Sequence, residues 1–445
     1  MYTFSDIKES IMDLGLTLIL FLASMVFCLA KGISMVTALI IGYILIFILA
    51  VKKGGTPKTL LKVSVLSMKN TLIVVQILLI IGILTASWRS GGTILYFVYW
   101  GVNLITPYLF LIIAFLITCL MSYAIGSSFG VACTLGVIFM ALARSGGVNE
   151  AITAGVIMSG IYFGDRASPA ASSLILTAAV TDTDSLHNVK LLMKTALVPY
   201  AICLLAYSAL SFVNPLDKVD TNILTAITEN FSMSSWLAVP ALIMLVLPLL
   251  KINIKTAMIL SIISSGFISI FIQDVSLKDF LYYCIMGYQS DINTLGTMLN
   301  GGGLISMVEI CAILLISCTY SAIFNETDLI ADIQRKLETA MTKLGRFTVH
   351  LLSSILFCAV FCNQTIAIMM SSTLFKEPYK NTGSSGQDLA IDIGNSTIVV
   401  AGLVPWCIAC SVPLSFLQVG IEALPYSILL YTIPLWYLIK RKAKK

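Results

Sequence analysis

Four short polar segments interrupt otherwise apolar stretches of the sequence, at 126–130 (GSSFG), 164–169 (GDRASP), 363–365 (NQT) and 394–397 (GNST). A helix that breaks in apolar surroundings leaves backbone N–H and C=O groups free, and nearby hydroxyl, amide and carboxylate groups can join them in binding an ion or a small solute. The segments therefore predict a binding site. The candidate residues at or just after the breaks are Ser127, Ser128, Asp165, Arg166, Ser168, Ser172, Asn363, Gln364, Thr365, Asn395, Ser396 and Thr397.

Asp165 is the first candidate for a functional residue and for a ligand to Na+. A carboxylate between two short apolar segments is costly in free energy unless it has a partner or binds a cation. Neighbouring positions on a helix point apart, so we expect Arg166 to serve another group, such as the carboxylate of a solute held by its planar guanidinium. The alternative for both residues is a structural ion pair or a place at the membrane surface.

Other titratable residues are expected to have smaller roles in binding or transport. Glu309 lies in the apolar run 304–323 and becomes a candidate proton carrier if it faces a cavity. Asp388, Asp392 and His350 lie nearer to breaks or helix ends, where interfacial or capping roles are the rule.

The composition determines where these breaks must lie. Of the 445 residues, 58% are hydrophobic and 11% are charged, whereas soluble domains have roughly 45–50% and 25%. So few charged residues cannot cover a water-exposed surface, which excludes a soluble enzyme. We predict an all-α integral membrane protein, and at about 20 apolar residues per crossing its length allows roughly 10–12 transmembrane helices.

The basic residues indicate orientation. They crowd the connection at 52–69 and the tail at 440–445. The positive-inside rule places both segments in the cytoplasm, and we expect the protein to lie in the plasma membrane. The N-terminus is then expected to be cytoplasmic as well.

The net charge of +5 forms no basic stripe with interleaved aromatic residues, so no nucleic-acid partner is expected. The eleven cysteines lie almost wholly in apolar runs and are expected to be apolar fillers.

The breaks also suggest internal repeats. A hairpin over 14–51 precedes a first unit at about 70–213 and a second at about 279–440, and interrupted apolar segments follow in the same order in both units. Such punctuation at corresponding places is typical of transporters built from repeats, with the site where the breaks meet.

The interrupted segments resemble the Na+/H+ antiporter C family (NhaC type), within a larger group of secondary ion transporters. The resemblance covers most of the chain and is carried by GSSFG at 126–130, YFGDRASP at 162–169, NGGGLISM at 300–307, and the block from 363 through Pro-Trp to Pro-Tyr at 425–426. It implies secondary transport driven by a Na+ or H+ gradient without another cofactor. It also implies two inverted repeats with broken helices and re-entrant hairpins, and often a homodimer in the lipid bilayer.

The sequence departs from the family at several polar positions. Ser172 stands where relatives usually have the aspartate of Ser-Asp-Thr-Thr, and Asn395 where they have that of Glu-Asp-Ser-Gly-Thr. We expect both to line one cavity. Because carboxylates supply strong ligands for Na+, their loss favours an alternative cargo, a small organic acid or amino acid, over the Na+/H+ exchange that is the family default.

Two other classes of protein fit less well. GSSFG matches the G-x-S-x-G pattern with Ser128 as nucleophile, yet it lacks a strand-turn-helix setting and a histidine nearby, so an enzyme is not expected. A channel would not require broken helices in both halves. We therefore predict a secondary active antiporter.

Overall fold

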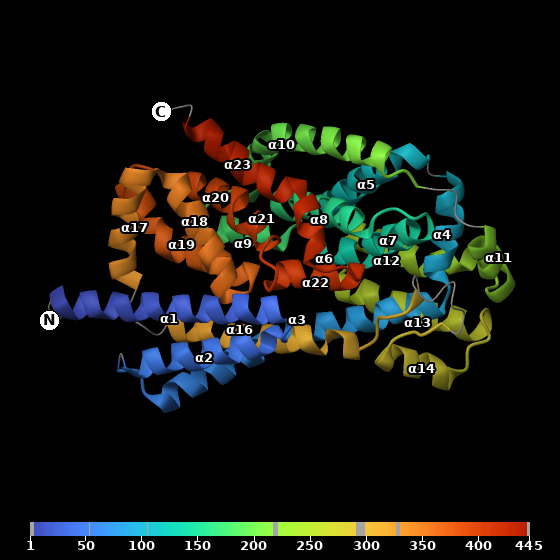
Figure 1. The fold of residues 1–445 in the computed structure, drawn as a ribbon, viewed down its shortest axis with the longest axis horizontal. Helices are drawn as coiled ribbons and strands as arrows, with labels where there is room; N and C mark the ends of the chain where they lie inside the picture. The colour runs from blue at the N-terminus through green and yellow to red at the C-terminus, as the bar shows by residue number, and fades with distance from the viewer. Residues whose placement is uncertain are drawn as a thin grey trace.

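The computed structural model describes residues 4–52, 54–104, 106–216, 221–290, 299–325 and 330–442, and within these the chain is almost entirely helical, without a β-sheet (Figure 1). The first helices are α1 (Phe4–Lys31), α2 (Met35–Lys52), α3 (Pro57–Ser90), α4 (Thr93–Leu104), α5 (Phe110–Ile125), α6 (Ser128–Val131), α7 (Val137–Ser145), α8 (Glu150–Ala167), α9 (Ser172–Thr181), α10 (Ser185–Val213), α11 (Thr221–Asn230), α12 (Val239–Leu249), α13 (Ile254–Phe271) and α14 (Leu277–Met286). The later ones are α16 (Val308–Asn325), α17 (Ile330–Leu344), α18 (Arg346–Phe361), α19 (Gln364–Asn381), α20 (Gly386–Asn395), α21 (Thr397–Ala401), α22 (Ile408–Leu417) and α23 (Ile428–Lys442). The predicted all-α fold is confirmed.

Several helices have the length and composition of membrane spans. Among the described residues, those long and apolar enough are 35–52, 57–90, 107–125, 128–145, 185–213 and 254–271. Large apolar side chains on these helices face outward, with Leu205 75% and Val213 78% exposed at the surface of α10. Such an apolar exterior is suited to lipid, and the chain is a multi-pass membrane protein.

Helix α8, which carries Asp165, lies in the interior of the molecule. It packs against α5, α7, α10 and α23, and it occupies the centre of the ribbon in Figure 1. Along one edge of that view, α1, α2, α3 and α16 run side by side, and α16 contacts both α2 and α3. The peripheral helices thus enclose the segment with the first functional candidate.

Close packing of small residues brings α5 and α8 together. A Cβ added to Gly164 would lie 2.1 Å from the backbone carbon of Ser122, and one added to Gly160 would lie 1.9 Å from Oγ1 of Thr118. Only glycine fits such close approach of two helices, as is common in membranes. The position of Asp165 is therefore set directly by this contact.

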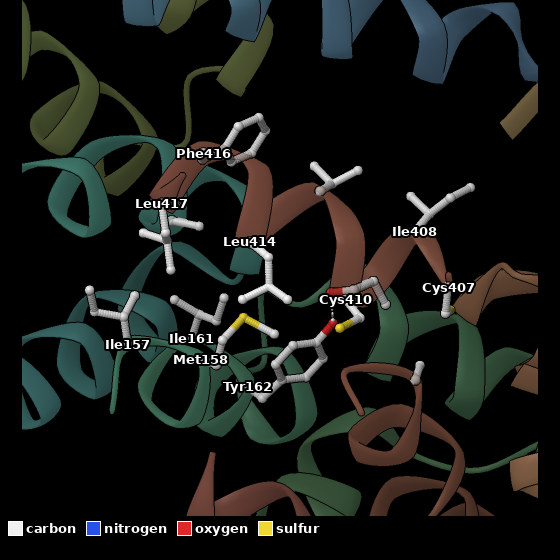
Figure 2. Packing of buried hydrophobic residues seen from close by; sticks show 14 of the residues in the cluster. Ile157, Met158, Ile161, Tyr162, Cys407, Ile408, Cys410, Leu414, Phe416 and Leu417 are labelled. Carbon is white, nitrogen blue, oxygen red and sulfur yellow. Dashed lines mark hydrogen bonds between the residues drawn. The ribbon is translucent and has the colours of Figure 1, made fainter. Parts of the chain in front are cut away.

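Apolar packing holds the other side of α8 against α22. Figure 2 shows Ile157, Met158 and Ile161 of α8 opposite Leu414 and Leu417 of α22. The hydroxyl of Tyr162 donates a hydrogen bond to the carbonyl oxygen of Ala409, so the buried phenol is paired. All eleven cysteines are buried and none is in a disulfide, in keeping with their expected use as apolar fillers.

Two sequence-based boundaries were wrong. The basic connection at 52–69 is largely helical, since α3 begins at Pro57 after the N-cap Thr56 and continues to Ser90. Lysines on an exposed helix face can extend their aliphatic stems along apolar surface, so they do not interrupt a helix. Likewise, α8 continues through Gly164 to Ala167, and the break in that hairpin is confined to 168–171.

Candidate functional site

Three of the four predicted breaks meet at a cavity of about 660 Å³. Its polar lining comes from residues far apart in the chain, and apolar residues of α3, α5, α6, α9, α12, α13, α16 and α22 form most of the remainder. The polar and charged lining residues are Ser127, Ser128, Asp165, Ser172, Ser173, Lys251, Asn363, Gln364 and Thr365. The cavity is therefore a candidate binding site built from both halves of the sequence.

The first break is formed by Gly126 and Ser127. Gly126 ends α5 in the left-handed conformation at φ 72°, and the Ser127 side chain then accepts a hydrogen bond from the Gly130 backbone N–H at the start of the next helix. A Cβ on Gly126 would lie 2.4 Å from the backbone carbon of Ala170, in the turn between α8 and α9. The hydroxyl of Ser168 also donates to the Tyr123 carbonyl oxygen at 2.6 Å. Two breaks are thus held in direct contact.

The break between α18 and α19 follows the same plan. Cys362 ends α18 at φ 54°, and the Asn363 side chain accepts hydrogen bonds from the backbone N–H groups of Thr365 and Ile366 at the start of α19. The cap satisfies two of the N–H groups that a helix start leaves free. It also leaves Gln364 and Thr365 on the wall of the cavity.

Asp165 and Gln364 connect the two halves of the chain. The Gln364 side-chain Nε2 donates to Oδ2 of Asp165 at 2.7 Å, although the residues are 199 positions apart. Asp165 is only 5% exposed. Ser173 donates to the backbone carbonyl oxygen of Asp165 and so ties the two arms of the α8–α9 hairpin together. A buried carboxylate at a cavity wall, beside amide and hydroxyl oxygens, can bind a monovalent cation or a proton.

Two helix starts add partial positive charge to the same cavity. Ser172 is the first residue of α9, whose N-cap, Ala171, has no side-chain hydrogen bond to the helix start. Gln364 is the first residue of α19, and Lys251 lines the cavity from the α12–α13 connection. Helix N-termini and an ammonium group attract anions. The cavity therefore offers one carboxylate for a cation and several donors for a carboxylate.

Arg166 lies on the other side of α8 and does not line this cavity. It is completely buried, and its Nη2 donates to the Leu192 carbonyl oxygen and to Oγ1 of Thr195. The same Oγ1 lies 2.9 Å from Oδ1 of Asn395. Arg166 and Asp165 thus point apart as predicted, but Asn395 joins Arg166 and not Ser172, contrary to the expectation that Ser172 and Asn395 share one cavity.

Comparison with known proteins identifies the family of the chain. The profile of the Na+/H+ antiporter family matches residues 160–439. The chain belongs to this family. The match begins just before Asp165 and includes three of the four breaks, and the NhaC-type assignment from the sequence is confirmed.

The relatives of this antiporter are named for different cargoes. A malate-2H(+)/Na(+)-lactate antiporter of Bacillus subtilis (strain 168) is 24% identical over 406 residues, covering 89% of this chain and 86% of the relative. The Na(+)/H(+) antiporter NhaC of the same organism is 24% identical over 387 residues, 85% of each. The arginine/ornithine antiporter ArcD of Halobacterium salinarum is 24% identical over 339 residues, covering 74% and 70%. All three relatives are named as antiporters.

The fourth break of the antiporter lies in a separate polar layer. Between α20 and α21, a hydrogen bond of 2.9 Å joins Oγ of Ser396 to Nδ1 of His350. Oγ1 of Thr397 lies 2.8 Å from Oγ of Ser354. All four side chains are buried. The predicted candidates Ser396 and Thr397 therefore face α18 of the antiporter and not the cavity.

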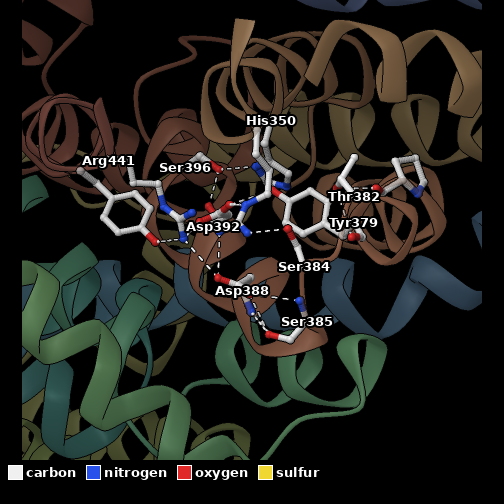
Figure 3. Close-up of polar contacts among 12 residues, drawn as sticks. His350, Tyr379, Thr382, Ser384, Ser385, Asp388, Asp392, Ser396 and Arg441 are labelled. Carbon is white, nitrogen blue, oxygen red and sulfur yellow. Dashed lines mark hydrogen bonds and ion pairs between the residues drawn. The ribbon is translucent and has the colours of Figure 1, made fainter. Parts of the chain in front are cut away.

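A buried ion network beside this layer was missed by the sequence reasoning. Asp392 is completely buried, where an interfacial place was expected, and its Oδ2 accepts from Nε of Arg346 at 3.0 Å and from the hydroxyl of Tyr379 at 2.8 Å. Arg441 of α23 lies 3.3 Å from the other carboxylate oxygen and also pairs with Asp388 (Figure 3). The available signal was the spacing of Asp388 and Asp392, because residues four apart share a helix face.

Glu309 is placed outside the cavity. It lies exposed in the first turn of α16, where one carboxylate oxygen accepts a hydrogen bond from the hydroxyl of Ser34 at 2.5 Å. Ser34 belongs to the connection between α1 and α2. A role for Glu309 as proton carrier stays a prediction.

Proposed function

We propose that Asp165 binds the coupling ion of this antiporter, Na+ or H+, and that the transported solute or ion occupies the adjoining cavity. The observation that carries this proposal is the contact between Asp165 and Gln364 at the wall of a cavity where three helix breaks meet. A carboxylate in the interior of a membrane protein is costly unless it has such a task. The other proposed ligands are Ser127, Ser128, Ser172, Asn363, Gln364 and Thr365.

The proposed mechanism is alternating access between two repeats. In this proposal the units at about 70–213 and 279–440 are related by inversion and move relative to each other, while the hairpin at 14–51 stays at the periphery. Asp165 belongs to the first unit and Gln364 to the second, so their hydrogen bond would form and break as the units move. A site at the interface of two repeats is typical of secondary transporters.

Na+/H+ exchange is the first proposal for the cargo, because it is the activity for which the family is named. Exchange of a small organic acid or an amino acid is the second. It is favoured by Lys251 and the starts of α9 and α19 at the cavity, which suit a carboxylate, while Asp165 suits a cation or an ammonium group. Relatives named for malate and lactate, or for arginine and ornithine, support this alternative.

We further propose that the protein lies in the plasma membrane as a homodimer with both termini in the cytoplasm. The start of α1 and the end of α23 lie toward the same side of the molecule in Figure 1, which supports a common side for the termini. The basic C-terminal segment favours the cytoplasmic side.

Transport in proteoliposomes tests the proposed role of Asp165. An imposed Na+ gradient should drive a pH change inside vesicles, and separate gradients of Na+ and H+ should drive uptake of labelled carboxylates or amino acids if these are the cargo. Asp165→Asn keeps the shape but removes the charge, so we expect it to abolish coupled transport. The matched control is Asp182→Asn, since Asp182 lies exposed at the end of α9 and pairs with Lys376. Normal coupled transport by Asp165→Asn at every pH would contradict the proposal.

A further inference from the structure

Arg166 is a buried cation with too few partners. Its side chain is 0% exposed, Nη2 is hydrogen-bonded, but Nε and Nη1 have no hydrogen-bond partner. The amide Nδ2 of Asn395, in the same cluster, is also buried without a partner. Unpaired buried donors on a charged group are costly, and they indicate a missing acceptor.

No carboxylate of the described residues supplies the missing negative charge. Arg166 forms no ion pair within this part of the chain. Asp165 faces the cavity and accepts from Gln364, and Asp392 is paired with Arg346 and Arg441. Water could accept the unpaired hydrogen bonds, but it would leave the positive charge uncompensated in an apolar environment.

We propose that Arg166, Thr195 and Asn395 form a binding site for a small anion, either a halide or the carboxylate of a small solute. Arg166 provides the charge and two unpaired donors, and Asn395 provides the unpaired donor Nδ2. The Thr195 hydroxyl links them, since it accepts a hydrogen bond from Arg166 and donates one to Oδ1 of Asn395, each at 2.9 Å. A cation is excluded because the guanidinium is itself positive and carries no acceptor.

The site lies between two of the helix breaks and apart from the Asp165 cavity. Arg166 is in the last turn of α8, before the turn at 168–171, and Asn395 is the last residue of α20. Thr195 of α10 is partly exposed, so the cluster lies near a surface on that side. An anion bound here would neutralise the Arg166 guanidinium where the hairpin of α8 and α9 meets α20, and it would stabilise their contact.

Anion-dependent thermal unfolding of the full-length protein in detergent tests this site. Protein in potassium gluconate, whose anion is too large for a closed cluster, is titrated with potassium chloride or with potassium acetate. A ligand that binds only the folded state raises Tm in proportion to the logarithm of its concentration above Kd. We expect chloride, acetate or both to raise Tm, with little effect far below Kd and a rise that is linear in the logarithm of concentration above it. Chloride alone assigns a halide site, and acetate alone assigns a carboxylate site.

Two variants and one control make the test specific. Asn395→Asp places a carboxylate next to the Thr195 hydroxyl that also contacts Arg166, so the protein should stay folded while the anion-dependent rise is lost. Arg166→Gln should lose it as well. Lys194→Gln removes an exposed charge next to Thr195, so it should keep the rise. The proposal is overturned if no anion raises Tm, if Asn395→Asp responds like the unaltered protein, or if Lys194→Gln loses the response.

Discussion

At the scale of single residues, the described lining of the cavity contains one carboxylate, Asp165, and a set of neutral oxygens. Asp165 accepts its side-chain hydrogen bond from an amide, Gln364, and the nearest helix start presents Ser172 and Ser173. A site with a single carboxylate binds Na+ less tightly than one with two, because neutral oxygens carry less charge. Ion affinity is therefore expected to respond to each acid added or removed here.

Ser172→Asp tests that expectation. Ser172 lines the cavity and is the first residue of α9, a position where a carboxylate is also favoured by the helix dipole. We expect roughly tenfold higher apparent affinity for Na+ from the added charge, and lower uptake of any anionic solute. Na+-driven pH changes and labelled-solute uptake are measured in the same vesicles.

Ser276→Asp is the matched control, because Ser276 is an exposed N-cap at α14 and lies outside the cavity. Unchanged Na+ dependence and unchanged solute uptake in Ser172→Asp, at normal expression, would show that Ser172 does not face the transported ion.

At the scale of elements, the contact between α5 and α8 fixes the height and rotation of Asp165. Gly164 directly precedes Asp165, and the Cβ of any other residue there would meet the backbone of Ser122 at 2.1 Å. Backbone cannot move aside as a flexible side chain does, so the two helices would have to separate. A residue with no chemistry of its own thus positions the carboxylate.

Gly164→Ala is expected to lower both the transport rate and Tm. Separation of α5 from α8 shifts Asp165 away from Gln364, and overpacking of this kind costs about 1–3 kcal/mol. Gly15→Ala on α1 serves as control, since a Cβ there meets nothing within 4 Å. Transport rate and Tm are compared for both variants. Equal, unperturbed transport in the two would mean that the α5–α8 contact does not position the site.

The ion network joins α18, α20 and α23, three elements that are separated in sequence. Asp392 is buried at the centre of the network. Asp388 is more exposed, lies at the edge of the network and forms ion pairs with both Arg346 and Arg441. Removing one partner of a buried ion pair leaves the other charge uncompensated, which costs about 3–5 kcal/mol. Removing a partner at the edge costs less, because water can replace it.

Asp392→Asn should therefore lower Tm far more than Arg441→Gln does. The first variant leaves Arg346 and Arg441 without their buried counter-charge, whereas the second leaves Asp392 paired with Arg346. Tm is measured by thermal unfolding in one detergent at one pH. Similar losses in the two variants would place the main contribution in Arg441 and not in the buried carboxylate.

At the scale of the whole molecule, the sequence predicted the helical class and the places where helices break. Gly126 and Cys362 end helices in the left-handed conformation, and Ser127 and Asn363 cap the helices that follow, so local residue types were sufficient there. Helix boundaries at Pro57 were misjudged because lysines on a helix face resemble a polar connection. The expected 10–12 spans and the inverted repeats stay predictions.

The grouping of the polar residues could not be predicted from local pattern. Asn395 was expected beside Ser172, yet α20 packs against α9 and α10 in a way that directs Asn395 to Thr195. Asp392, which was expected near a helix end, is buried where Arg346 of α18 and Arg441 of α23 meet it. His350, expected in an interfacial or capping role, is buried against Phe375 and Tyr379 of α19 and contacts Ser396. Such long-range pairings depend on tertiary packing, which a helical period does not encode.

The adjacency of Asp165 and Arg166 on α8 has an electrical consequence. A charge that crosses the membrane potential gains or loses about 2.3 kcal/mol per 100 mV. With no anion bound at Arg166, the two residues carry opposite formal charges on neighbouring positions of one helix end, so a movement of this end through the field transfers no net charge from this pair. The return of the empty antiporter should then be independent of voltage, and only the bound ions should make transport electrogenic. Flux at potentials set by K+ and valinomycin should therefore vary with voltage only through cargo and coupling ion, and voltage-dependent return of the empty carrier would contradict this.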